Sequence, residues 1–486
     1  MRGAVPMLLL AAGLAGCATS RPPFRCEAHG GRPWRAVYSS TFVVVTDLDE
    51  DDARALAVEL EGIRNGVAAS LFQRRHDPPV RVAVIAFRST ADYQRFAPAG
   101  SAAYYARGAA DPKIVIPGTM GMEQRRVLAH EMAHHVSSYV LLRTPRWFSE
   151  GLASWAETVG TTSWGNRMVT GPVPPGRRPL TRPQRIPARQ LLAWDASVPP
   201  GELAAYYDAA WLLVHYLSSQ YPEALQAFEA RLVGADEPDD AFQSAFPQWS
   251  RATPGGLELL DGELDAWARN GRFDARPVQP GPPPSLTVQP IEPAEVHAIR
   301  LLLWAGGASS EGDEDTIRRE LDEALSEDPT HPVLLRELAR REGRDPLPLA
   351  SLAVKGHPAD PRAWSFLADS LPPEEKAERE TALRRAVELA PRNPLALSAL
   401  AELLLDEGRS GEALPLARRA VQLGPFSSTV LDIYASVVGD LGDCPQGLLA
   451  ARRALDVFPD DGNPEERARL ELHLAGHVAR CTRTGP

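Results

Sequence analysis

Short apolar runs alternate with longer stretches of helical periodicity between Trp34 and Val159. The short runs are rich in valine and isoleucine, which is typical of buried strands. The longer stretches place apolar residues three and four positions apart, as on one face of a helix. This order of elements predicts an α+β domain. Strands are expected at 41–46, 81–87 and 113–116, and helices at 49–72, 119–140 and 146–159.

Proline divides the rest of the chain. Residues 172–187 contain six prolines and predict a long irregular excursion that is able to overhang a site. Helical patterning returns between residues 202 and 269. Seven prolines then follow in the short stretch from Pro277 to Pro293. Because proline disrupts packed elements, we expect a linker at 276–293, which ends a domain spanning 34–275.

A 34-residue period follows the expected linker. The segment Ala386–Pro391 recurs at Ala420–Pro425 and again at Ala454–Pro459, with weaker copies upstream. A helix–turn–helix unit of this length that ends in proline resembles the tetratricopeptide repeat (TPR). The resemblance implies an all-α, TPR-like solenoid over 294–486 that binds a substrate or a protein partner. A capping helix is expected at Pro464–Arg480. The best unit matches the repeat at Leu397, Leu400, Ala401, Leu404, Ala413, Ala420 and Pro425.

The motif His130-Glu131-Met132-Ala133-His134 lies within one of the expected helices. Residues four positions apart share a helix face, so both imidazoles can bind one ion. Zinc accepts imidazole nitrogen in a tetrahedral shell that two such histidines half fill. The intervening Glu131 is placed to accept a proton from a water molecule.

A possible third ligand, Glu150, lies in the next expected helix, within Trp147-Phe-Ser-Glu-Gly-Leu-Ala153. Together the two segments resemble the gluzincin branch of zincin metallopeptidases, particularly the bacterial peptidase-MA-like domains. This resemblance implies a zincin-like fold over 34–275, with His130, His134 and Glu150 as ligands of Zn²⁺. It also implies that Glu131 acts as the general base in the hydrolysis of peptide bonds.

The same resemblance implies a residue that stabilises the oxyanion. Tyr207 is the first candidate, followed by Tyr206 and His215, although a tyrosine on this helix can equally belong to the core. Two further residues near these motifs, His135 and Glu157, have ordinary structural explanations. His135 points about 100° away from His134 and is expected to pack or to support the ligands. Glu157 is a weaker rival ligand or a solvated surface acid.

The first residues of the chain indicate where in the cell the protein is located. Arg2 precedes a short apolar run that ends in Leu14-Ala15-Gly16-Cys17, which resembles the lipobox of bacterial lipoprotein signal peptides. The resemblance implies that residues 1–16 are removed, that Cys17 carries the lipid and that 17–33 form a tether. We therefore expect a protein of the bacterial cell envelope, anchored by lipid and facing the periplasm, at the outer rather than the inner membrane.

The chain has three other cysteines besides Cys17. The periplasm is oxidising, so these cysteines are able to form disulfides. Cys444 begins the second helix of the last repeat, and Cys481 ends the expected cap. Antiparallel helices bring such ends together, so a disulfide between them is sterically reasonable, with two unpaired thiols as the alternative. Cys26 has no comparable partner.

Charge narrows the range of partners. The chain of 486 residues has 52 basic and 63 acidic side chains, a net charge of −11, which disfavours nucleic acid as a partner. Two functions then remain from different classes. The first is a lipid-anchored zinc metallopeptidase whose repeats recruit peptide or protein substrates. The second is a TPR scaffold lipoprotein that carries an inactive zincin-like domain.

Overall fold

We describe a computed structural model of the chain. The expected signal peptide, Cys17 and Cys26 lie outside the described residues, as does most of the expected tether. Within the part that is described, no helix is both long and apolar enough to cross a bilayer. The structure describes residues 27, 30–72, 80–97, 103–106, 113–160, 168–181, 183–194, 198–199, 201–234, 236–279, 281–305, 314–458 and 462–483.

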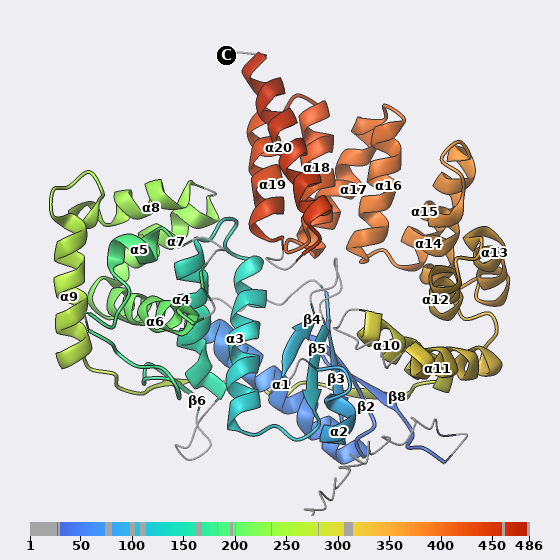
Figure 1. Ribbon diagram of the computed structural model, residues 1–486, viewed down its shortest axis with the longest axis horizontal. Helices are drawn as coiled ribbons and strands as arrows, with labels where there is room; N and C mark the ends of the chain where they lie inside the picture. The colour runs from blue at the N-terminus through green and yellow to red at the C-terminus, as the bar shows by residue number, and fades with distance from the viewer. Residues whose placement is uncertain are drawn as a thin grey trace, which may run out of the picture.

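The N-terminal half contains a mixed six-stranded sheet (Figure 1). The three predicted strands are present and pair in parallel at its centre. Three further strands, which are short and lie toward the edges, lack a clear apolar run and escaped prediction. In spatial order the strands are β4 (Tyr104–Ala106), β5 (Lys113–Pro117), β3 (Val82–Phe87), β2 (Phe42–Thr46), β1 (Arg35–Tyr38) and β8 (Thr287–Pro290).

Two long helices cover one face of this sheet. They are α1 (Glu50–Leu71) and α3 (Met122–Ser138), both close to their predicted bounds. Alternate strand residues such as Val82 and Val84 share a buried cluster with Leu60 of α1 and Met132 of α3. Every second residue of a strand faces the helices, and residues three to four apart on a helix face the sheet. This packing fixes which face of α3 is buried. The opposite face of α3 carries His130 and His134, the two histidines of the His-Glu-x-x-His (HExxH) motif.

The other face of the sheet is covered by the first helices of the C-terminal half. Ile85 and Phe87 share a buried cluster with Trp304 and Leu334 from those helices. The ring centroids of Phe96 and Trp304 are 5.0 Å apart. The two halves of the chain therefore share one core. The helices that contribute to this cluster include α10 (Pro293–Ala305), α11 (Glu314–Glu327), α12 (Pro332–Glu342) and α13 (Pro346–Gly356), together with the short α2 (Thr90–Tyr93).

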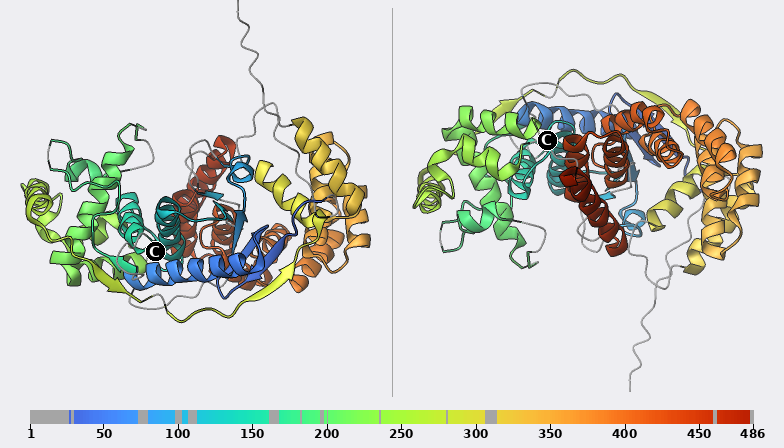
Figure 2. Two further views of the ribbon diagram at one scale, coloured as in Figure 1. Left: turned by 90° about the horizontal axis from the view of Figure 1, so that it is seen from below. Right: turned by 90° about the horizontal axis from the view of Figure 1, so that it is seen from above.

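The predicted linker at 276–293 is wrong in part. It contains β8, which pairs with β1, and also β7 (Arg276–Val278), which pairs with β6 (Met168–Thr170). Proline is tolerated in these strands because an edge strand does not need every N–H. Figure 2 shows this stretch running along α1, where a Cβ on Gly281 would lie 3.5 Å from Asn65.

A helical layer beside α3 completes the N-terminal half. Its core holds large aromatic side chains, among them Trp211, Phe148 and Phe228, which are all buried. The ring centroids of Trp147 and Phe228 are 5.8 Å apart. The helices are α4 (Arg146–Ala156), α5 (Ala188–Leu192), α6 (Leu203–Gln220), α7 (Pro222–Val233), α8 (Pro238–Ala245) and α9 (Gly256–Asn270), with 3₁₀ turns at Glu157–Gly160 and Pro247–Trp249.

The C-terminal half is an all-α array of antiparallel helix pairs, which confirms the predicted TPR-like solenoid. Its regular helices are α14 (Pro361–Ser370), α15 (Lys376–Leu389), α16 (Pro394–Asp406), α17 (Ser410–Leu423), α18 (Ser428–Asp440) and α19 (Cys444–Asp456).

The predicted period is present in these pairs. Helices α16 and α18 begin at Pro394 and Ser428, which are separated by one full repeat. Ala401, Ala413 and Ala420 are fully buried, as close approach of paired helices requires. The cap is α20 (Pro464–Arg483), and a disulfide joins Cys444 to Cys481 with 5.6 Å between their Cα atoms.

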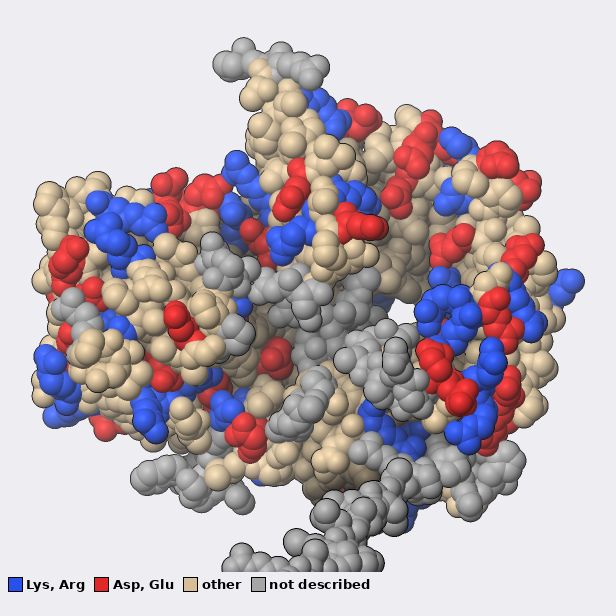
Figure 3. Space-filling model, viewed as in Figure 1, with Lys and Arg blue, Asp and Glu red and all other residues tan. Residues whose placement is uncertain are grey.

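The far end of the solenoid returns to the N-terminal half (Figure 1). The hydroxyl of Tyr139, at the end of α3, donates a hydrogen bond to the carbonyl oxygen of Leu423 at 3.2 Å. Arg143 pairs with Asp456 and with Glu237. The first helices of the array therefore contact the sheet, and its last helices contact the end of α3. The face of the molecule drawn in Figure 3 carries interspersed acidic and basic side chains.

Candidate metal centre

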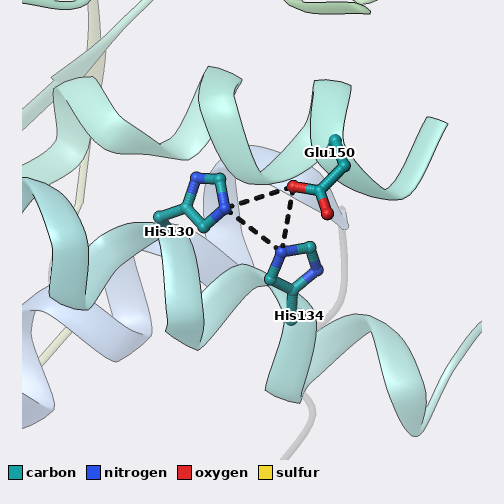
Figure 4. Close-up of side chains that lie close together, drawn as sticks. All are labelled: His130, His134 and Glu150. Atoms are coloured by element: carbon teal, nitrogen blue, oxygen red, sulfur yellow. Dashed lines mark hydrogen bonds and ion pairs between the residues drawn. The ribbon is translucent and has the colours of Figure 1, made fainter. Parts of the chain in front are cut away.

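Two neighbouring helices bring the three predicted ligands together (Figure 4). Helix α3 begins after Gly121, whose N–H donates to the side chain of Gln124 at 2.9 Å. Helix α4 begins after Pro145, which ends the short connection from α3. The connection sets the two helices side by side, so that a carboxylate in the second turn of α4 faces the histidines of α3. The three predicted ligands are His130, His134 and Glu150.

Their donor atoms are spaced as ligands of one small ion. The Nε2 atoms of His130 and His134 are 3.2 Å apart. The Oε2 atom of Glu150 lies 3.3 Å from the first and 3.4 Å from the second. Two ligands about 2.0–2.1 Å from a tetrahedral zinc ion lie about 3.3–3.4 Å from each other. Glu150 Oε2 is also buried without a hydrogen bond. The residues therefore fit a zinc ion.

Each histidine is oriented through its other ring nitrogen. Nδ1 of His134 lies 3.1 Å from the hydroxyl of Ser149, and Nδ1 of His130 lies 3.0 Å from Oε1 of Glu157. Such partners leave Nε2 free to face a metal ion. Glu157 is not the solvated surface acid of one prediction, because its side chain is 1% exposed and lies 3.0 Å from Nδ1 of His130. The three donor atoms that converge come from His130, His134 and Glu150. Glu157 is the first residue of the 3₁₀ turn that follows α4.

The charges in the site favour a cation. Burial raises the pKa of Glu150, but the two histidines outweigh burial and hold this pKa well below its usual range. Burial lowers the pKa of His130, but the neighbouring carboxylates of Glu150 and Glu157 raise it to about 9 overall. A bound metal ion would take the place of this proton, since only the neutral imidazole is a ligand.

Among the three oxyanion candidates, the structure places only Tyr207 beside the centre. The ring centroids of Tyr207 and His130 are 6.1 Å apart, and burial, followed by the charge of Glu150, raises the pKa of Tyr207 to about 12. Tyr206 is buried and accepts a hydrogen bond from Gln190.

His215, the third candidate, lies in the aromatic core. Its Nε2 is 2.9 Å from the carbonyl oxygen of Gly171, and its Nδ1 accepts a hydrogen bond from Trp267 at 3.2 Å. Both ring nitrogens are therefore engaged away from the metal centre. The sequence could not separate these candidates because all three lie within three turns of one helix.

His135 packs and does not support a ligand. Its ring is buried between Tyr139 and Phe426, with centroids 5.3 and 5.7 Å away. Burial lowers the pKa of His135 to about 4, so the ring is neutral at physiological pH. This histidine therefore belongs to the contact between α3 and the solenoid.

The proline-rich excursion contributes a residue that the sequence did not reveal. Arg177 donates a hydrogen bond to Oε1 of Glu157, and its guanidinium carbon lies 5.0 Å from the ring centroid of Tyr207. The sequence predicts only that residues 172–187 could overhang a site. An arginine in an irregular segment carries no periodic signal that would relate it to a distant helix.

Comparisons with known proteins bear on the fold alone. No protein-family model matches the chain, and a search of curated proteins gives no match. A thermophilic TPR protein of Thermus thermophilus is 18% identical and covers 38% of this chain and 99% of its own, with a TM-score of 0.30.

Two further solved structures are similar at the same level. A MamA structure is 16% identical and covers 36% of this chain and 94% of its own, with a TM-score of 0.26. Yeast Tom70 is 12% identical and covers 74% of this chain and 72% of its own, with a TM-score of 0.31. TM-scores this low do not support an argument about the fold. The repeat architecture is therefore assigned from the helix pairs of the chain itself. The zincin-like fold and the lipid anchor stay predictions.

Proposed function

We propose that the chain is a zinc-dependent metallopeptidase of the bacterial envelope. The observation that carries the proposal is the spacing of 3.2–3.4 Å among the donor atoms of His130, His134 and Glu150. Three protein ligands leave the fourth tetrahedral position open, which distinguishes a catalytic zinc site from a structural one. In this proposal the lipid on Cys17 holds the protein at the membrane.

The side chains around the ligands supply the groups that peptide hydrolysis needs. When bound, zinc lowers the pKa of water toward about 7 and polarises a carbonyl group. Glu131 follows His130 on α3 and is half-buried, so its carboxylate can accept the proton of the attacking water and pass it to the leaving amine. Tyr207 keeps its proton because its pKa is raised, so its hydroxyl can donate a hydrogen bond to the oxyanion.

The repeats have a separate role in this proposal. Stacked helix pairs form a curved surface suited to extended peptide segments. The array is joined to the peptidase half through the shared core and through the end of α3. A substrate bound on the repeats would thus be held at a raised local concentration beside the metal centre.

Substitution of Glu131 by glutamine tests the proposal. The variant keeps the shape of the side chain and the three ligands but cannot accept a proton. We expect wild type and variant to hold equal zinc by elemental analysis, while cleavage of casein, an unfolded model protein, falls by at least about a hundredfold. The companion variant His134→Ala should lose the metal. Unchanged cleavage by Glu131→Gln would contradict the role of the base.

A TPR scaffold with an inactive metal site is the second candidate. It is favoured by the solenoid and by Arg177, which covers one face of Tyr207. This candidate predicts that the wild-type protein binds an unfolded polypeptide and releases it uncut, with or without zinc. The casein assay therefore separates the two functions directly.

A further inference from the structure

The excursion at 172–187 reaches the metal centre through one side chain. Gly176 adopts a positive φ of 85°, which a glycine tolerates readily, and it reverses the chain just before Arg177. The side chain of Arg177 is 11% exposed, so the turn directs it inward. The segment is therefore tied to the site through Arg177 and does not merely pass over it.

Arg177 takes part in a chain of contacts that ends at a metal ligand. Its Nη2 donates to Oε1 of Glu157, and the same oxygen lies 3.0 Å from Nδ1 of His130. The second carboxylate oxygen, Oε2, accepts from Arg126 at 3.0 Å. Two guanidinium groups thus hold the two oxygens of one buried carboxylate. Arg126 secures the oxygen that faces away from the histidine, whereas Arg177 secures the oxygen that orients it.

The same guanidinium group also lies over the ring of Tyr207. The Cζ atom of Arg177 is 5.0 Å from the ring centroid, within the range of a cation–π contact. Tyr207 in turn lies edge to face with His130 at 6.1 Å. A planar guanidinium group can stack on a ring and donate in its own plane at once, which an ammonium group cannot do. The residue type is therefore matched to both contacts.

From this geometry we propose that Arg177 is a positioning residue of the metal centre, which orients His130 through Glu157 and orders the ring of Tyr207. The excursion is then a structural part of the site and not a cover that blocks it. The inference rests on the proposed function, but it makes a claim about zinc affinity that does not depend on turnover.

The test measures zinc affinity of the metal-free full chain by competition with a chelator. We expect Arg177→Ala to bind zinc about tenfold more weakly than wild type, because loss of outer partners of a ligand costs about 10–100-fold. Arg177→Lys should recover part of the loss, since lysine restores a charge beside Glu157 but not the stacking. Arg178→Ala is the matched control, because it removes an exposed positive charge from the same turn.

Chemical rescue separates positioning from folding. Guanidinium ion at low millimolar concentration should restore zinc affinity to Arg177→Ala but leave wild type unchanged, because only the variant has a vacated site for it. Circular dichroism of the metal-free proteins shows whether each variant is folded. Zinc affinity of a folded Arg177→Ala within twofold of wild type would overturn the inference alone. Absence of zinc binding by wild type would overturn the proposed function as well.

Discussion

The candidate metal centre is organised through the second ring nitrogen of each histidine. His130 and His134 both present Nε2 to the same point because Glu157 and Ser149 engage their Nδ1 atoms. Without such partners a histidine ring is free to turn or to present its other nitrogen. The HExxH spacing thus selects the ligands, and the surrounding hydrogen bonds select the ligand atoms.

Glutamine in place of Glu157 should weaken zinc binding by about 10–100-fold, because the neutral amide cannot support His130 as a carboxylate does. Competition with a chelator measures the effect. Glu123→Gln is a matched control, since Glu123 also accepts a hydrogen bond from Arg126 but is exposed and does not contact His130. Equal zinc affinity in Glu157→Gln and wild type would show that His130 needs no carboxylate partner.

At the scale of elements, the site depends on how closely α4 and α6 approach. Gly151 follows the ligand Glu150 on α4 and faces α6. A Cβ atom at this position would lie 2.5 Å from Cγ2 of Val214 and 2.8 Å from the carbonyl oxygen of Ala210. The glycine therefore allows the two helices to touch, and this contact carries Tyr207 toward the ligands.

Alanine at Gly151 should push α6 away from α4. We expect the free energy of unfolding to fall by about 1–3 kcal/mol, the usual cost of overpacking, together with a loss of the proposed peptidase activity. Gly262→Ala is the control, because a Cβ there meets nothing within 4 Å and alanine favours a helix by about 0.5–1 kcal/mol. Urea unfolding measures both variants. Equal stability of Gly151→Ala and wild type would contradict the close packing.

At the scale of the whole molecule, the solenoid and the N-terminal half form one body. The first repeat helices complete the core beneath the sheet. Helix α17 and the turn after it contact the end of α3. His135, which adjoins the ligand His134, is one of the contacts through its ring pair with Phe426. The repeats are therefore positioned against α3, the helix that carries the two candidate ligand histidines.

Removal of the Phe426 ring should loosen this contact. We expect Phe426→Ala to leave the repeat helices folded but to raise amide hydrogen exchange at residues 135–143, where the ring packs against His135 and Tyr139. Leu472→Ala is the control, because Leu472 is 71% exposed and lies on the cap. Unchanged exchange in Phe426→Ala would mean that the solenoid does not support the end of α3.

Much of the local structure was predictable because it follows from short-range periodicity. The central strands, the two helices of the metal centre and the 34-residue repeat each repeat a pattern within a short stretch of chain. Short edge strands such as β4 and β8 were not predicted, because three or four residues are too few to show an alternating pattern of apolar and polar positions. The seven prolines between Pro277 and Pro293 indicated a linker, yet the short strands β7 and β8 accommodate the prolines that fall within them.

The sequence by itself determined which residues can bind a metal ion, because the i, i+4 spacing of His130 and His134 holds on any regular helix. It also determined the repeat architecture. Only the tertiary structure decided that Glu157 contacts His130, that Arg177 contacts Glu157, and that Tyr207 lies beside the candidate ligands. It likewise decided that both halves share one core. These contacts join residues far apart in the sequence, and such contacts depend on how whole elements pack.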